Sequence, residues 1–169
     1  GVSLGYVFIK NFFDNTVKTP EDIQKRGENV LAWIPQIEGA VTANGQNEFE
    51  FIVAKRPDSI PSEAFRALRT RVQFSKVDTD KFKTLLVTSS APSEGKTMIS
   101  GNLAGSIAQT GKKTVLVDCD LRKPRMHTFF RTNRYPGVVD YLFGQATMEE
   151  IVRQSEIPDL YYITAGTIP

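Results

Sequence analysis

The chain has 169 residues, a length that suits one folded domain. Apolar residues make up 40% of it, which supports a packed core, and 21 Lys and Arg residues nearly balance 19 Asp and Glu. This balance gives no reason to expect nucleic acid as a partner. The single cysteine, Cys119, excludes an internal disulfide and fits a reducing compartment.

Residues 1–13 are apolar but shorter than the roughly 20 residues that a membrane-spanning helix needs. They also lack the cationic start of a signal peptide. Two interpretations remain open: a buried strand or helix start, or the cytoplasmic end of a transmembrane helix. The second has mild positive-inside support from Lys10, Lys18, Lys25 and Arg26. Residues 1–13 are therefore expected to form a membrane-proximal segment.

Residues 14–57 are expected to be a connector with small elements and no chemistry. Thr19 and Pro20, followed by two acids, predict a helix start. Residues 48–54 (EFEFIVA) alternate between polar and apolar and then become apolar, which predicts a half-buried strand.

Residues 59–74 are predicted to be helical. Their apolar side chains recur at helical spacing, at Ala64, Phe65, Leu68 and Val72. Glu63, Arg66 and Arg69 advance three residues at a time along one side of this helix. Two interpretations stay open for them: an intrahelical Glu63–Arg66 ion pair worth about 0.2–0.5 kcal/mol, or contacts with another subunit.

The stretch 82–120 organises the rest of the chain. It begins with a predicted apolar strand over 82–87 and continues through a polar loop, 89–97, into a helical pattern. It ends with a second apolar strand, 114–117, followed by acidic residues. Strand, phosphate-sized loop, helix and strand form a βαβ unit, which predicts an α/β fold that holds a nucleoside triphosphate and its metal.

The polar loop meets the pattern G-x-x-x-x-G-K-[ST] except at its first glycine, where Ser90 stands. Gly95 lets phosphate oxygens approach the backbone, Lys96 supplies a positive charge for the β- and γ-phosphates, and the Thr97 hydroxyl can join the Mg²⁺ shell. Pro92 presets a turn dihedral. The alternative is a solvated Lys96, which is unfavourable because a helix start is itself positive.

Two acids follow the second strand. Successive strand residues alternate faces, so Asp118 and Asp120 are expected to point the same way and Cys119 the opposite way. Ligands of open α/β sheets gather at this end of the strands. The pair is therefore expected to hold Mg²⁺, with one acid positioning or deprotonating an incoming hydroxyl. The alternative is an acidic turn.

Residues 91–97 (APSEGKT) and 115–124 (VLVDCDLRKP) together resemble the bacterial tyrosine kinases of capsular and exopolysaccharide export. These are P-loop proteins with a variant Walker A motif and a Walker A-prime motif. Residues 63–69 (EAFRALR) resemble the E-x-x-R-x-x-R helix that joins their subunits into a ring. Residues 162–166 (YITAG) resemble the strand and turn before their Walker B region.

The resemblance implies an α/β, P-loop NTPase-like fold with a mostly parallel sheet flanked by helices. Residues 58–169 would be the N-terminal part of the tyrosine-kinase domain. The Walker B strand, the later elements and a tyrosine-rich tail are expected outside this sequence, so the sheet is expected to be incomplete.

The resemblance also implies an ATP-dependent protein-tyrosine autokinase that regulates polysaccharide polymerisation and export at the cytoplasmic face of the bacterial inner membrane. Lys96, Asp118 and Asp120 would be catalytic, and Thr97 and the two aspartates would bind Mg²⁺. ATP or ADP would contact the residues Ala91, Pro92, Ser93, Glu94, Gly95, Lys96, Thr97, Met98 and Arg122. The implied partners are the tyrosine tail of a neighbouring subunit in a ring-like homo-oligomer, joined through Glu63, Arg66 and Arg69, and a membrane-embedded polysaccharide co-polymerase region.

Two other functions remain as alternatives. A ParA/MinD-like positioning ATPase would carry a signature lysine where this chain has Ala91. A non-catalytic assembly module of a polysaccharide co-polymerase would have a degenerate nucleotide site, whereas Lys96, Thr97, Asp118 and Asp120 are all present. Both features favour the kinase.

The remaining chain supplies few candidates for chemistry. His127, the single histidine, lies in an apolar-flanked stretch and is expected to be structural. Residues 138–143 and 148–154 are predicted to be short helices, the second capped by Thr147. Residues 160–164 are apolar and β-branched, which predicts a further strand of the sheet.

Overall fold

The structure is a computed structural model that describes residues 20–25, 27–37, 51–75 and 84–168. The chain divides into two compact units, 1–33 and 34–169, and each is described by itself. Among the described residues, no helix combines the length and apolarity needed to cross a membrane. The predicted membrane-proximal segment, 1–13, lies outside the described residues.

In the first unit, the described residues form one short helix, α2 (Pro20–Gln24). It starts where proline and the following acids predict a helix. Proline suits this position because its missing N–H would have no partner in the first turn.

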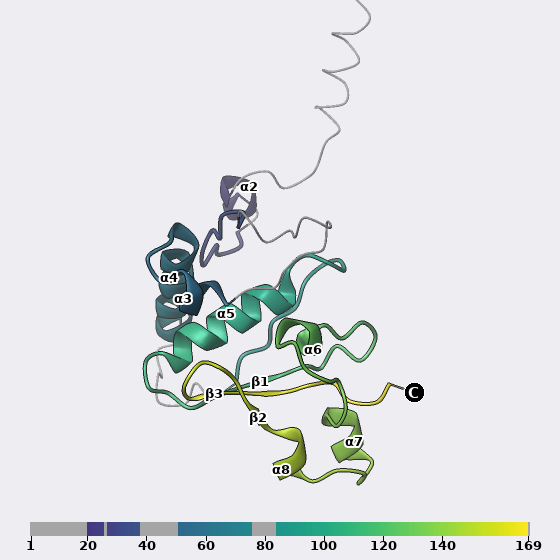
Figure 1. Ribbon diagram of the computed structural model, residues 1–169. Coiled ribbons are helices and arrows are strands. Elements are labelled where there is room, and N and C mark those ends of the chain that lie inside the picture. Colours follow the sequence, from purple (N-terminus) through teal and green to yellow (C-terminus); the bar gives the residue numbers. More distant parts are fainter. Residues whose placement is uncertain (1–19, 26, 38–50, 76–83, 169) are drawn as a thin grey trace, which may run out of the picture. The chain divides into compact units, whose positions relative to one another are not determined.

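The second unit is built around a three-stranded sheet (Figure 1). Its strands are β1 (Thr114–Val117), β2 (Arg153–Gln154) and β3 (Leu160–Ile163), in the order β1-β3-β2. β1 and β3 are parallel, with Val117 opposite Ile163, so both strands end at the same edge. β2 pairs antiparallel with β3.

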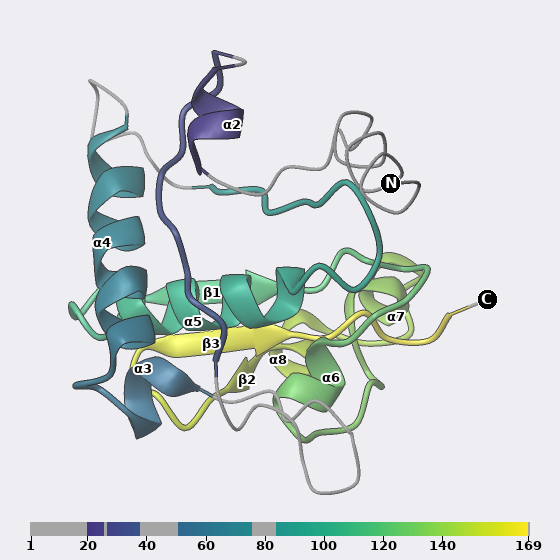
Figure 2. The same ribbon diagram turned by 90° about the horizontal axis from the view of Figure 1, so that it is seen from above.

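Helix α5 (Lys96–Ala108) packs on β1 and β3, as Figure 2 shows from above. Its other neighbours are α3 (Ile52–Lys55) and α4 (Ile60–Phe74). α4 begins one residue after the predicted start, with Ser59 as its N-terminal cap. The Ser59 Oγ accepts the Ser62 N–H at 3.4 Å, and Phe65, with no exposed surface, anchors the apolar face of the helix.

Two glycines on α5 allow this close packing. A Cβ at Gly101 would lie 2.5 Å from the Phe129 ring, and one at Gly105 would lie 2.9 Å from Ile157. Because real Cβ atoms do not approach other carbons this closely, larger side chains at either position would push α5 away from its neighbours.

The prediction of a strand over 48–54 is wrong for the residues that the structure describes, because residues 52–55 form helix α3. Side chains from other helices satisfy its backbone groups. The Asn102 Oδ1 accepts the Val53 N–H at 3.2 Å, and the Ser62 hydroxyl donates to the Ile52 carbonyl at 3.0 Å. With Ile52 and Val53 buried as well, the segment needs no neighbouring strand.

The prediction of a strand over 82–87 also fails where the structure describes it. Residues 84–88 form no strand, and 82 and 83 lie outside the described residues. Leu86 is 83% exposed, and β1 pairs only with β3 among the described strands. A strand requires hydrogen bonds from a neighbour, and no described segment supplies them here.

Three short helices complete the second unit: α6 (Met126–Phe129), α7 (Val138–Leu142) and α8 (Met148–Ile151). Thr147 caps α8 as predicted, in a capping box with Glu150. The predicted helix over 148–154 ends early because β2 pairs with β3. The Arg153 guanidinium holds this strand by donating to the carbonyls of Asn133 and Pro136 at 2.7 and 2.8 Å.

Candidate nucleotide site

The phosphate-sized loop lies directly before α5, and two left-handed residues give it its curvature. Gly95 is the N-terminal cap of the helix with φ 87°, and Ser93 has φ 65°. Space around Gly95 is open, so its backbone conformation is what favours glycine. The first N–H groups of α5 have no acceptor within the helix, and the helix dipole adds positive charge there. The loop therefore presents an anion-binding helix start.

Glu94 shapes the first half of this loop. Its carboxylate accepts the Ala91 N–H at 3.0 Å and the Ser90 hydroxyl at 3.0 and 3.1 Å. These bonds, the one from the Ala91 backbone first, lower the pKa of Glu94, so the group stays ionised at neutral pH. Sequence reasoning gave Glu94 only a nucleotide contact. Ser90 stands where the motif usually has a glycine, and an acid follows four residues later. This pair was the sequence signal for a hydrogen bond within the loop.

Lys96 folds back over the loop. Its Nζ donates to the Ser89 Oγ at 3.1 Å and lies 3.9 Å from the Asp120 Oδ2. The lysine side chain keeps 29% of its surface exposed. The structure therefore brings Lys96 close to Asp120. A freely solvated lysine would not have such a neighbour.

The two acids after β1 have different environments. Asp118 is 7% exposed, and its oxygens accept the N–H groups of Asp120 and Met126, both at 3.1 Å. Burial raises the pKa of Asp118, and these two hydrogen bonds oppose the rise. Asp120 is half-buried, accepts the Lys123 N–H at 3.0 Å and faces Lys96. Asp118 thus organises the turn into α6, while Asp120 faces the loop.

The other predicted contact residues lie near this centre. Thr97 and Met98 are half-buried in the first turn of α5, and Pro92 is exposed in the loop. Arg122 is exposed in the turn after Asp120. Cys119, between the two acids, is an exposed free thiol.

The predicted interface residues lie on α4. Arg66 pairs with Glu63 on the same helix and donates to the Pro57 carbonyl at 2.9 Å, as the intrahelical interpretation predicts. Arg69 donates to the Ser106 carbonyl at 2.8 Å and to its hydroxyl at 3.2 Å, a tie to α5 that sequence reasoning missed. Ser106 lies ten residues after Lys96, or roughly 15 Å along the helix. Within one chain, the structure does not bring Arg69 to the loop.

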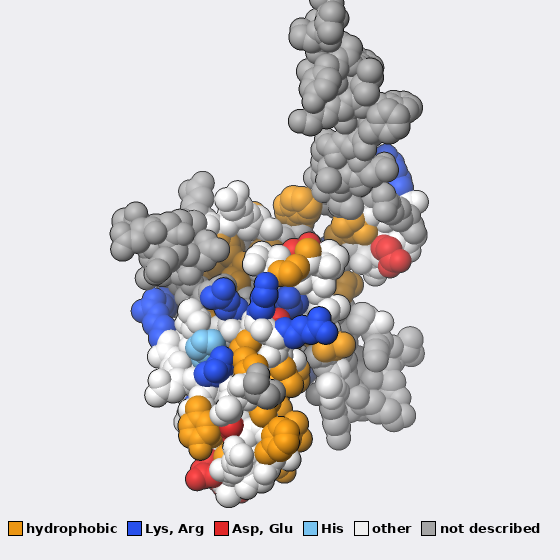
Figure 3. Space-filling model, turned by 90° about the vertical axis from the view of Figure 1, so that its right-hand side faces the viewer, with side chains coloured by type: hydrophobic (Ala, Val, Ile, Leu, Met, Phe, Trp, Pro, Cys, Tyr) orange, Lys and Arg blue, Asp and Glu red, His pale blue; other side chains and the backbone are white. Residues whose placement is uncertain are grey.

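His127 lies near Asp118, and Lys and Arg side chains gather around the histidine (Figure 3). Its Nδ1 is buried, and no described residue forms a hydrogen bond with it. Burial lowers the pKa of His127 most, Arg134 and Arg125 lower it further, and Asp118 opposes them. The imidazole is therefore neutral at pH 7.

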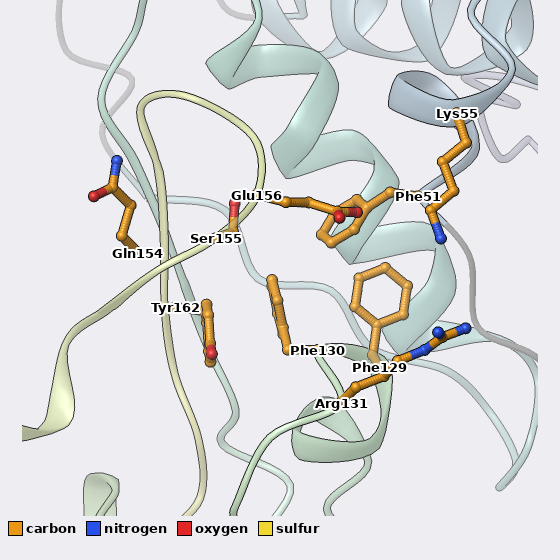
Figure 4. Close-up of a pocket in the computed structure, with 9 residues that line it drawn as sticks. All are labelled: Phe51, Lys55, Phe129, Phe130, Arg131, Gln154, Ser155, Glu156 and Tyr162. Atoms are coloured by element: carbon orange, nitrogen blue, oxygen red, sulfur yellow. The ribbon is translucent and has the colours of Figure 1, made fainter.

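A pocket of about 180 Å³ lies outside this site (Figure 4). Aromatic side chains dominate it: Phe130 stacks on Tyr162 with ring centroids 3.7 Å apart, and Phe51 meets Phe129 edge to face at 4.6 Å. None of the predicted nucleotide residues lines it. This cluster joins the end of α6 to β3 and to the start of α3.

The fold and the loop geometry define an α/β domain of the P-loop type. No protein-family model matches the chain. Over its whole length the chain is 34% identical to a protein named putative tyrosine-protein kinase EpsB from Ralstonia solanacearum, of which it covers 24%. Over 70% of its length it is 40% identical to tyrosine-protein kinase YwqD from Bacillus subtilis, of which it covers 49%.

The solved kinase domain of the Escherichia coli tyrosine kinase ETK matches 91% of the chain with a TM-score of 0.80 and 30% identity, and 62% of that domain is covered. In sequence and in fold, the chain is therefore similar to part of the bacterial tyrosine kinases. It spans about a quarter of the length of the curated relatives that match it throughout.

Proposed function

We propose that this chain is part of an ATP-dependent protein-tyrosine autokinase that regulates capsular or exopolysaccharide polymerisation and export. One observation carries the proposal: Lys96, at the helix start that follows the loop, lies between Ser89 and Asp120 at the carboxyl edge of the sheet. A cation, helix N–H groups and a carboxylate at one helix start are the groups that bind a polyphosphate and its metal, and this supports the proposal.

The loop residues would bind ATP or ADP through phosphate. Backbone N–H groups of 94–97 would hold phosphate oxygens, and Lys96 would neutralise charge as the γ-phosphoryl group transfers. Arg122, exposed beside Asp120, would approach the same phosphates.

Mg²⁺ fits these residues. Among the described residues, no three His, Cys, Asp or Glu side chains form a metal cluster. Nucleotide-bound Mg²⁺, however, takes only one or two protein carboxylates, with its other ligands from phosphate and water. Asp120, whose Oδ2 lies 3.9 Å from the Lys96 Nζ, and Thr97 would hold the ion. When bound, Mg²⁺ supplies charge neutralisation at the transferring phosphoryl group.

Asp118 would position and deprotonate the accepting tyrosine hydroxyl. The tyrosine oxygen forms a bond to the γ-phosphorus, the bond from that phosphorus to the bridging oxygen breaks, ADP leaves, and the proton passes to Asp118. Because burial raises its pKa, Asp118 is a stronger proton acceptor than an exposed aspartate. The different environments of the two acids favour this division of roles.

The wider protein is part of the same proposal. Residues 58–169 would belong to the kinase domain, 14–57 would be the connector and 1–13 the membrane-proximal segment at the cytoplasmic face of the inner membrane. Partners would be the tyrosine tail of a neighbouring copy in a ring and a membrane-embedded co-polymerase region. The names of the curated relatives as tyrosine kinases support the kinase-domain part of this proposal.

Nucleotide titration and phosphotyrosine detection test the proposal. Isothermal titration of the chain with MgADP is expected to release heat with a stoichiometry near one, whereas a non-catalytic assembly module would give none. The complete protein, incubated with ATP, is expected to accumulate phosphotyrosine on immunoblots. ATP hydrolysis stimulated by a partner or a membrane, without phosphotyrosine, would instead indicate a positioning ATPase.

The proposed ring contact through α4 gives a separate prediction. Arg66→Ala combined with Arg69→Ala is expected to lower the oligomer mass of the complete protein in light scattering. The bonds of Arg66 to Glu63 and Pro57 are exposed, whereas those of Arg69 to Ser106 are partly buried. Arg66→Ala should therefore lower the mass with the smaller loss of melting temperature. An unchanged mass in both variants contradicts the interface role.

A further inference from the structure

Five exposed cations lie on residues 121–134, the segment that follows the strand-end acids, and one of them, Arg131, lines the aromatic pocket. The other four form one set. They are Arg122, Lys123, Arg125 and Arg134. Neither ion pair found between described residues, Arg66 with Glu63 and Lys96 with Asp120, includes any of them. This set is called the basic rim below.

Part of the basic rim surrounds His127. Arg134 and Arg125 lie near enough to this ring to lower its pKa, and Asp118 lies near enough to oppose them. In Figure 3, positively charged side chains gather around the single histidine. The basic rim therefore borders the acid that we assign to the tyrosine hydroxyl.

The acids nearby do not neutralise the basic rim. Asp118 is buried and bonded to two backbone N–H groups, and Asp120 faces Lys96. The two acids also face different parts of the site. Asp120 looks toward the phosphate loop, whereas Asp118 is bonded to Met126, the neighbour of Arg125. Positive charge thus extends from the loop to the α6 side of the site. Arg125 and Arg134, on that side, are not among the proposed nucleotide contacts.

We infer that the basic rim selects an acidic acceptor segment, in which Asp or Glu residues flank the tyrosine to be phosphorylated. The inference rests on the proposed kinase function. An acidic segment gains attraction from several exposed cations at once, and this attraction orients it during encounter. The tyrosine hydroxyl then lies at Asp118, and its acidic neighbours lie against Arg125 and Arg134.

Fluorescence anisotropy with labelled peptides tests the inference on the chain itself. The probes are tyrosine flanked by glutamates, by serines or by lysines, measured with MgADP present. The glutamate peptide is expected to bind tightest, and its affinity should fall as salt rises from about 50 to 500 mM. The double variant Arg125→Glu, Arg134→Glu should weaken it by roughly fivefold or more, because each exposed charge contributes modestly.

A matched control is Lys112→Glu with Lys113→Glu, two exposed lysines just before β1, at the opposite end of that strand. This control should change the affinity by less than about twofold, since screening limits exposed charges at this distance. Equal binding of the serine and glutamate peptides overturns the inference, as does an equal loss in the control variant. Binding to anionic phospholipid vesicles but not to the glutamate peptide also overturns it, in favour of a membrane surface.

The same samples separate this inference from the proposed function. MgADP titration of Arg125→Glu, Arg134→Glu is expected to match the unaltered chain, because neither residue belongs to the proposed nucleotide site. If the unaltered chain gives no heat with MgADP, the kinase proposal fails. If it binds MgADP but shows no charge preference among the peptides, only the acidic-acceptor inference fails.

Discussion

Lys96→Met is expected to weaken MgADP binding to the chain by roughly 10- to 100-fold and to abolish phosphotyrosine in the complete protein. Methionine keeps the length of the side chain but removes a charge-assisted hydrogen bond to phosphate, worth about 1.5–3 kcal/mol, and about 1.4 kcal/mol corresponds to tenfold. The change also leaves Asp120 without the cation 3.9 Å from its Oδ2, so its negative charge would repel the nucleotide.

Isothermal titration measures the binding change, and an immunoblot against phosphotyrosine measures the activity. Lys112→Met is the matched control, because Lys112 is exposed just before β1 and lies outside the site. It should bind MgADP like the unaltered chain. If Lys96→Met retains full affinity and its phosphotyrosine signal, Lys96 has no part in the mechanism.

Asp140→Ala is expected to lower the free energy of unfolding by about 2–4 kcal/mol. Asp140 is 1% exposed, and its carboxylate accepts the Gly137 N–H at 2.7 Å and the Thr167 N–H at 3.1 Å. Alanine would leave the buried Gly137 N–H unpaired, which costs about 1–3 kcal/mol, and would remove a hydrogen bond of about 1 kcal/mol from the exposed Thr167. The same carboxylate caps α7 and joins it to the chain after β3.

The pH dependence of this effect has a definite sign. Burial alone raises the pKa of Asp140, but the hydrogen bonds from Thr167 and Gly137 outweigh it and hold the pKa below the ordinary 3.8. A lowered pKa in the folded state means that the carboxylate stabilises the fold above its unfolded pKa. This contribution is lost as the pH falls through the folded pKa.

Urea unfolding near pH 7 and near pH 3 measures this dependence. Asp140→Asn, which keeps one acceptor oxygen but no charge, should be less stable than the unaltered chain at pH 7, and the difference should shrink at pH 3. Glu156→Ala, at an exposed acid, is the control and should stay within about 0.5 kcal/mol. If Asp140→Ala unfolds at the same urea concentration as the unaltered chain, the carboxylate does not hold α7.

Local sequence signals predicted the elements whose cause is local. Ser59 and Thr147 cap the helices that were expected after them, because a hydroxyl can accept an N–H of the next turn whatever surrounds it. Gly95 adopts the left-handed backbone that the loop requires, and α5 begins directly after it. The apolar stretches 114–117 and 160–163 pair as the parallel strands β1 and β3.

The sequence did not predict the elements whose hydrogen-bond partners lie far along the chain. Residues 84–88 have a strand pattern but no described neighbour to supply hydrogen bonds. Residues 52–55 become helical because Asn102 and Ser62, far along the chain, satisfy the backbone. Arg69 also donates to the Ser106 carbonyl, a contact within the chain that the sequence did not predict. Pattern alone cannot tell which partner a polar group will meet.

The candidate site likewise has features that the sequence predicts and features that only the structure shows. The sequence by itself determined the chemistry available, namely a glycine, a lysine and a threonine at a helix start and two carboxylates after a strand, because these follow from residue type and spacing. Only the tertiary structure decided how the two carboxylates differ. Asp120 faces Lys96, while Asp118 is buried against the turn into α6, because α6 packs through its aromatic side chains against β3. Side-chain environment, and hence each pKa and role, depends on which residues from other parts of the chain pack around the group.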